Sequence, residues 1–143
     1  KIEKYFYHYL MDNINDDMPA YKQVGVKYIE FAKYETNLFK VLFMSRSELF
    51  ASEFITQDEE FKELSKIIKL STELSDSDIE LFHTKMWIFT HGIATLIATG
   101  TVVFTDEQIK ELLSYEFQAL MLLENNKDNK WVIKNKKEGV NNE

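Results

Sequence analysis

The sequence lacks cysteine altogether and contains one proline and four glycines in 143 residues. Without cysteine, a disulfide framework and a thiolate metal site are both excluded. The lack of thiols also suits a reducing compartment, so we expect a cytoplasmic protein. So few prolines and glycines favour long helices with short connections. No signal-peptide pattern follows Lys1, and the missing initiator methionine suggests a fragment of a longer chain.

Basic residues are in the minority, because 17 lysines and arginines stand against 24 aspartates and glutamates, which gives a net charge of −7. A surface that binds nucleic acid normally carries a clustered basic patch. The lysine-rich stretch 127–137 is diluted with acids and asparagines. We therefore expect no direct binding of DNA by this domain.

Apolar residues make up 45% of the chain, and 14% of all residues are aromatic. This content is ample for the core of a single domain. A bulky core explains the aromatic excess most simply. The functional alternative is an apolar cavity between helices, lined with a few polar groups, which is a common form of small-molecule site.

The stretch 86–104 contains no charged residue, but four threonines, one histidine and two glycines interrupt it. A membrane span needs roughly 20 predominantly apolar residues. We therefore predict no membrane span. The pattern favours a helix that is buried on nearly all sides, either inside a soluble protein or between two copies of it.

A helix is predicted over 76–99 from its end signals. Ser75 can act as the N-cap, and Asp76 and Asp78 place negative charge at the positive end of the helix dipole. Gly100 stands just past the end, where a left-handed conformation is needed.

The two sides of this helix differ at 100° per residue. One stripe carries His83, Trp87, His91, Ala94 and Ala98, and the opposite stripe carries Phe89, Gly92, Ile93 and Leu96. Both stripes could be ordinary core. Alternatively, one faces an internal cavity and the other a second subunit. A glycine within a helix costs roughly 1 kcal/mol relative to alanine, so we expect Gly92 to permit the close approach of another backbone.

The remaining chain shows helical periodicity and no strand pattern, so the predicted class is all-α, a bundle of about six helices. Thr105 and Gln108 form a capping box for the last helix. We expect one domain over 1–123 and a polar tail over 124–143, with Trp131, Val132 and Ile133 as a candidate docking point. Helices are also predicted over 1–15, 18–35, 37–44 and 105–123. A further helix carries Phe61, Leu64, Ile67 and Ile68 and is capped by Ser52 or Thr56.

The sequence contains no complete catalytic or metal-binding motif of the kinds considered below. Glu80 and His83 form one Glu-x-x-His, but a di-iron bundle needs two, and neither His8 nor His91 has a glutamate three residues before it. His-Glu-x-x-His, a phosphate loop and a nucleophile elbow are absent. Bis-histidine haem ligation would require His83 and His91 on facing helices. We expect no metal, no other cofactor and no enzymatic activity.

Two segments some forty residues apart carry a more specific pattern. Residues 31–43 read FAKYETNLFKVLF and residues 87–100 read WIFTHGIATLIATG. Together they resemble the C-terminal domain of TetR/AcrR-type transcriptional regulators, in the subgroup marked by Trp, His and Gly. The matching positions are Phe31, Ala32, Leu38 and Phe39 in the first segment, with Thr36 where proline is common, and Trp87, His91, Gly92, Leu96 and Gly100 in the second.

The resemblance covers about residues 1–123 and implies an effector-binding and dimerisation domain of a repressor. The helices at 76–99 and 105–123 would pair with their copies as a dimeric four-helix bundle. The helix at 1–15 would correspond to the connector to an N-terminal three-helix DNA-binding domain, which this sequence lacks. A small lipophilic effector in the core would shift the connector and release DNA.

Site residues follow from the stripes and the resemblance together. For the effector cavity we expect a lining of Tyr28, Phe31, Phe39, Phe43, Met86, Trp87, Thr90 and His91. For the homodimer interface we expect Phe89, Gly92, Ile93, Leu96, Leu112, Leu113, Phe117 and Leu120. Two other functions stay open: a stand-alone dimeric helical interaction module, and a di-iron or haem helical-bundle enzyme.

Overall fold

A computed structural model describes residues 2–44 and 58–126 of the chain. Within these ranges the structure contains helices and no strands, so the predicted all-α class is confirmed. The helices are α1 (Ile2–Met11), α2 (Ala20–Tyr34), α3 (Thr36–Phe43), α5 (Asp58–Thr72), α6 (Asp76–Ala98) and α7 (Asp106–Asn125).

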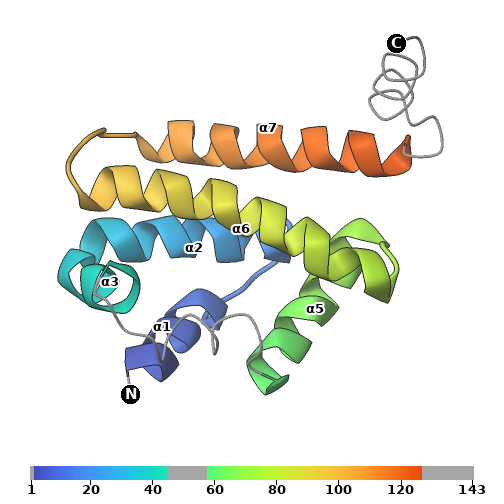
Figure 1. Ribbon diagram of the computed structural model, residues 1–143, viewed down its shortest axis with the longest axis horizontal. Helices are drawn as coiled ribbons and strands as arrows, with labels where there is room; N and C mark the ends of the chain where they lie inside the picture. Colours follow the sequence, from blue (N-terminus) through green and yellow to red (C-terminus); the bar gives the residue numbers. More distant parts are fainter. Residues whose placement is uncertain (1, 45–57, 127–143) are drawn as a thin grey trace, which may run out of the picture.

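Helix α2 lies at the centre of the described structure and contacts all five other described helices. Its most extensive contact is with α6. In Figure 1, α2, α6 and α7 run alongside one another, and α1 and α5 lie on the side of α2 away from α7. Side chains on several faces of α2 are buried, namely Tyr21, Gln23, Val24, Tyr28, Ile29, Phe31 and Ala32.

Helix α1 is shorter than predicted and ends at Met11 rather than near residue 15. The helix stops there because Asn13 takes a left-handed conformation with φ of 54°, which asparagine tolerates better than most residues. The buried Gln23 then holds the connection to α2. Its side-chain amide donates to the carbonyls of Asn15 and Met18, and its carbonyl accepts from the Asn15 amide.

The break between α2 and α3 occurs without a proline. Glu35 leaves the helical conformation, with φ of −116° and ψ of 47°, and ends α2 and precedes α3. Thr36 stabilises the corner, since its hydroxyl donates to the carbonyls of Ala32 and Lys33. The two helices predicted at 18–35 and 37–44 are therefore separate.

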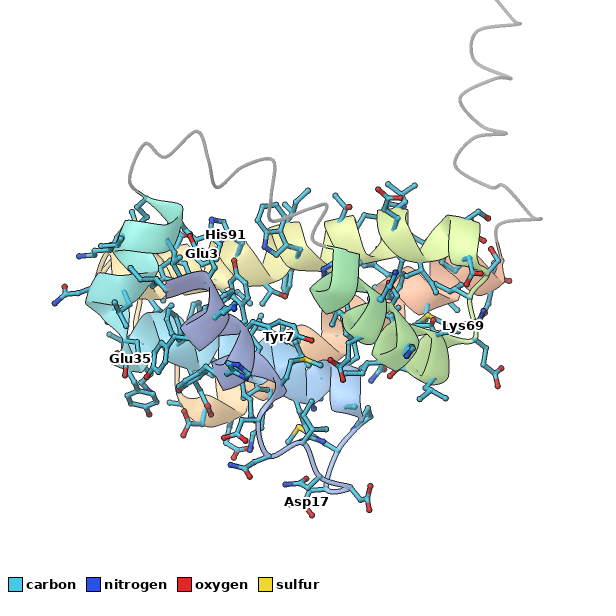
Figure 2. The ribbon with its side chains drawn as sticks, turned by 90° about the horizontal axis from the view of Figure 1, so that it is seen from below. Glu3, Tyr7, Asp17, Glu35, Lys69 and His91 are labelled. Atoms are coloured by element: carbon cyan, nitrogen blue, oxygen red, sulfur yellow. The ribbon has the colours of Figure 1, made fainter. Side chains whose placement is uncertain are left out.

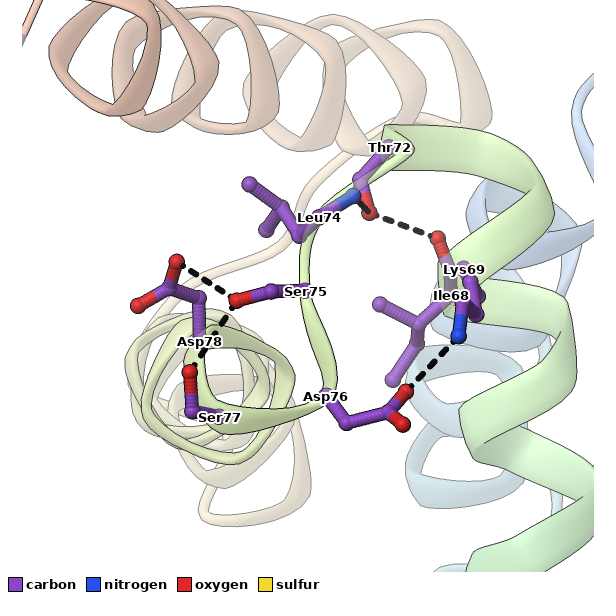
Figure 3. Close-up of polar contacts among 8 residues, drawn as sticks. All are labelled: Ile68, Lys69, Thr72, Leu74, Ser75, Asp76, Ser77 and Asp78. Atoms are coloured by element: carbon purple, nitrogen blue, oxygen red, sulfur yellow. Dashed lines mark hydrogen bonds and ion pairs between the residues drawn. The ribbon is translucent and has the colours of Figure 1, made fainter.

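The turn into α6 differs from the prediction in one respect (Figure 3). Ser75 occupies the N-cap position with extended backbone, but its side chain caps no backbone amide. Its hydroxyl donates to the Asp78 carboxylate instead, at 2.9 Å. Across the same turn, Lys69 at the end of α5 pairs with Asp76 at 2.9 Å.

The turn from α6 to α7 forms as predicted. Gly100 follows the last turn of α6 with φ of +72°, and the amide of Thr101 donates back to the Leu96 carbonyl. The capping box of α7 is confirmed, because the Gln108 amide donates to Thr105 Oγ1 and the Thr105 amide to Gln108 Oε1. The capping box thus gives hydrogen-bond partners to two backbone amides that have none within the helix.

Helix α6 is less enclosed than predicted, because one stripe along it is not covered by any other described helix. Leu81 is 59% exposed, Ile88 60% and Leu96 39%. The expectation of burial on nearly all sides is therefore wrong for the single chain, and the alternative of burial between two copies stays a prediction. None of the described helices has the length and hydrophobicity needed to cross a membrane.

Some expectations fall outside the described residues. These are the caps at Ser52 and Thr56 and the docking point at Trp131, Val132 and Ile133. Helix α7 extends to Asn125, two residues beyond the predicted domain boundary at 123.

Phe6 fastens α1 to the rest of the fold. Its ring centroid lies 5.4 Å from Tyr28, 4.9 Å from Phe31 and 5.3 Å from Phe43, each in an edge-to-face arrangement. The side chain is 3% exposed. Since α1 has only ten residues, it depends on this packing rather than on its own helical propensity.

We predict that Phe6→Ala releases α1, because burying a phenylalanine is worth about 3–5 kcal/mol. Hydrogen exchange should then show loss of protection for the amides of α1, with α6 and α7 still protected. Lys4→Ala, on an exposed position of the same helix, is the control and should leave protection unchanged. Retained protection of α1 in the Phe6 variant would contradict the assignment.

Candidate ligand-binding cavity

A cavity of about 290 Å³ lies between α2, α6 and α7, with α5 touching one end. Its lining is mostly apolar, with a few hydroxyl, amide and ring nitrogen groups, which is typical of small-molecule sites. The lining residues are Pro19, Tyr21, Lys22, Val24, Gly25 and Tyr28 from α2 and its start, Ser71 from α5, His83, Met86, Trp87 and Thr90 from α6, and Leu113, Ser114, Phe117 and Gln118 from α7.

The cavity lining is buried at one end and exposed at the other. Tyr28, Thr90 and Leu113 line the inner end and are 4%, 6% and 3% exposed. Pro19 and Gln118 line the other end and are exposed, so the cavity opens there. Gly25 keeps α2 near α7, since a Cβ at this position would meet Leu113 Cδ1 at 3.3 Å.

A chain of hydrogen bonds joins three side chains at the inner end. Trp87 Nε1 can only donate, and it donates to the Tyr28 hydroxyl oxygen at 3.1 Å. The Tyr28 hydroxyl also lies 2.8 Å from His91 Nδ1. Burial lowers the pKa of His91 and so favours the neutral imidazole, whose Nδ1 accepts the phenolic proton in the tautomer protonated on Nε2.

Aromatic rings enclose His91 on several sides. Its ring stacks on Trp87 at a centroid distance of 5.3 Å and lies 5.7 Å from Phe39 and 5.2 Å from Phe43. Figure 2 shows His91 on α6 beside α3, the helix that supplies both phenylalanines. His91 therefore supports Trp87 and Tyr28 from behind the cavity wall.

A second tyrosine–histidine pair lies nearer the mouth. The Tyr21 hydroxyl is 2.8 Å from His83 Nδ1. Burial lowers the pKa of His83 to about 4 and raises that of Tyr21, so both side chains are neutral near pH 7. The cavity wall thus contains both members of this pair, together with Tyr28 of the first pair.

Four of the eight residues predicted for the cavity line it: Tyr28, Met86, Trp87 and Thr90. Phe31 and Phe39 are instead fully buried in the core. Phe31 packs against Phe6 and Tyr9 of α1, because it lies on the face of α2 turned away from α7. Phe43 and His91 surround Tyr28 without lining the cavity.

Part of the cavity lining was not predicted from the sequence. Tyr21, Val24 and Gly25 lie on the same face of α2 as Tyr28, at spacings of three, four and seven residues, so helical periodicity from Tyr28 could have found them. The contributions of Ser71, Ser114 and Gln118 carry no such signal, since nothing in their local sequence shows that they meet in space.

The residues predicted for the dimer interface fall into three groups in the single chain. Gly92 and Leu96 are exposed. Ile93 and Leu113 are already buried within the chain, at 6% and 3% exposure, so they have little area left for a second molecule. The half-buried remainder is Phe89, Leu112, Phe117 and Leu120, of which Phe117 lines the cavity.

The exposed apolar stripe of α6 contains positions that the prediction did not include. Leu81 and Ile88 precede Gly92 and Leu96 along it. On α7, Tyr115 and Leu122 are 76% and 65% exposed. The exposed stripe shares Gly92 and Leu96 with the predicted interface, which stays a prediction.

Among the described residues, no three histidine, aspartate or glutamate side chains come close enough to hold a metal ion. His83 and His91 each use Nδ1 with a tyrosine. Comparisons with protein-family models, with curated proteins and with solved structures found no match for this chain. The geometry of the cavity and of the helix faces is therefore the basis for a functional proposal.

We predict that His83 makes the protein less stable in acid. The unfolded chain binds a proton at this residue below pH 6.5, while the folded protein does so only near pH 4, so stability falls as the pH falls through this window. Between pH 7 and 4.5 the wild type should lose about 2–3 kcal/mol more than His83→Gln, measured by urea unfolding.

The comparison with His83→Gln isolates the histidine, because this variant keeps every carboxylate of the wild type and can still accept a hydrogen bond from Tyr21. If both proteins lose the same stability between these pH values, His83 is not held neutral by burial.

Proposed function

We propose that this chain is the effector-binding and dimerisation domain of a TetR-type transcriptional repressor. A small lipophilic molecule occupies the cavity, and a second copy covers the outer faces of α6 and α7. DNA contacts belong to a helix-turn-helix domain that precedes α1 in such regulators.

One observation carries the proposal: the two sides of α6 differ, since one lines the cavity and the other is an exposed apolar stripe. Met86, Trp87 and Thr90 wall the cavity. Leu81 and Ile88, on the other side, present apolar area to solvent, each about 60% exposed. An apolar stripe on a monomer surface commonly marks an interface. A dimeric sensor requires a helix that contacts the ligand on one side and the second subunit on the other.

The described contacts also provide a route from the cavity to α1. Tyr28 lines the cavity with one face and touches the Phe6 ring edge-to-face at 5.4 Å with another. A ligand that moves Tyr28 or Trp87 therefore acts on the helix that would lead to the DNA-binding domain. Such a connection supplies a coupling free energy of typically 1–3 kcal/mol between ligand and DNA.

Gly92 supports the dimer. A Cβ at this position would meet nothing within 4 Å in the single chain, so no neighbour in the described structure explains a glycine in the middle of α6. Its cost in helical propensity is offset if the backbone of a second copy packs there.

We predict that Ile88→Glu converts a dimer into a monomer, because a buried unpaired carboxylate opposes association. Gly92→Leu should do the same by preventing close approach. Sedimentation at micromolar concentration measures both. Leu70→Glu is the matched control, since Leu70 is 86% exposed on α5 and is not part of the proposed interface, and this variant should stay dimeric.

If Ile88→Glu and Gly92→Leu both sediment like the wild type, the interface is not on this face of α6. If the wild type itself sediments as a monomer, the proposed dimerisation is wrong.

The ligand half of the proposal is tested with a thermal-shift screen of lipophilic compounds. We expect hits that stabilise the wild type by about 2.7 kcal/mol at 100 times Kd. Thr90→Leu should abolish these shifts, because it fills the inner end of the cavity. The hydroxyl of Thr90 donates only to the Met86 carbonyl of its own helix, so the change strands no partner.

Thr84→Leu is the matched control for this screen, because Thr84 makes the same bond to the Glu80 carbonyl but lies outside the cavity. Shifts that are equal in all three proteins would place binding elsewhere. A dimer without any ligand would favour the second candidate, a dimeric interaction module, for which the exposed stripe of α6 is the supporting observation.

A further inference from the structure

The polar groups of the cavity differ between its two ends. At the inner end, each polar side chain already has a partner within the protein. Trp87 Nε1 donates to Tyr28, Tyr28 bonds to His91, and the Thr90 hydroxyl donates to the Met86 carbonyl. An occupant gains nothing from a polar group there and would lose its hydration, so its inner part must be apolar.

The mouth offers polar groups that are not engaged. Lys22 and Gln118 line it, and Ser114 lines the cavity one turn before Gln118 on α7. The side chains of these three residues make no hydrogen bond or ion pair with another described residue. Lys22 is also the one lysine in the lining, which contains no arginine and no carboxylate. This group of donors suits a small anion, and a charged hydrogen bond is stronger than a neutral one.

The start of α2 adds to the positive character of the mouth. Pro19 is the N-cap and lines the cavity, but it has no side chain able to cap, and the first turn of α2 contains no acidic residue. The positive end of the helix dipole is thus uncompensated within this turn. Asp16 and Asp17 precede it, but they are exposed and do not line the cavity, and Figure 2 shows Asp17 at the outer tip of the loop.

We propose that the effector is an apolar-tailed monoanion, with a carboxylate held by Lys22 and Gln118 at the mouth and an alkyl or aryl tail that extends to Trp87 and Thr90. This inference rests on the cavity being the effector site. The distance along α2 from Pro19 to Tyr28 is nine residues, or about 13 Å, which sets the length of the tail.

The test measures binding of straight-chain carboxylates of six to fourteen carbons below their micelle concentrations, with the alcohols of the same lengths for comparison. In both series the affinity should rise by about fourfold per methylene and then stop once the chain spans the cavity. At equal length, the carboxylate should bind roughly tenfold more tightly than the alcohol.

Variants of Lys22 separate charge from shape. Lys22→Met should remove the preference for carboxylates and leave the binding of alcohols unchanged, and Lys22→Arg should keep the preference. Lys27→Met is the matched control, because Lys27 lies on the same helix outside the cavity and the change should have no effect.

The outcomes distinguish this inference from the proposed function. Equal binding of carboxylates and alcohols, or a preference that survives in Lys22→Met, overturns the anion while the effector site stands. Failure of both series also overturns it, even if the lipophilic screen yields other hits that Thr90→Leu abolishes. A screen with no such hits overturns the proposed function itself.

Discussion

The contact between α2 and α6 is the constraint on which the rest of the structure depends. Tyr21 meets His83 and Tyr28 meets His91, each with 2.8 Å between the hydroxyl oxygen and Nδ1. Because both residue numbers increase together, the two helices run in the same direction. The bonds lie two turns apart and fix both the register and the rotation of α6. A slip of one turn would break both bonds, and each buried tyrosine hydroxyl left without a partner costs about 1–3 kcal/mol.

The cavity follows from how the third helix meets this pair. Gly25 lets α7 approach α2 at Leu113, while the large rings of Tyr21 and Phe117 meet at 6.1 Å farther along. Tyr21, His83 and Tyr28, three of the four side chains that fix α2 against α6, also line the cavity, so residues that stabilise the fold would contact a ligand. Tyr28 carries this double role furthest, because it also touches α1 through Phe6.

The opposite side of α6 shows the other consequence of fixing its rotation. Once His83, Trp87 and His91 face α2 and α3, the stripe through Leu81 and Ile88 must face outward. Within one chain no other described helix covers it. Two tasks of an effector-binding dimer would thus be assigned to two sides of a single helix by one set of hydrogen bonds.

The sequence by itself determined the helical class, the end of α6 at Gly100 and the capping box at Thr105, because these depend on neighbours within a few residues. The expected cavity lining also included Met86, Trp87 and Thr90, which do line the cavity. Only the tertiary structure decided the rest, since rotation and register are set by partners distant in the chain. It turned Phe31 toward α1, buried Ile93, exposed Ile88, and brought Lys22 to the mouth of the cavity.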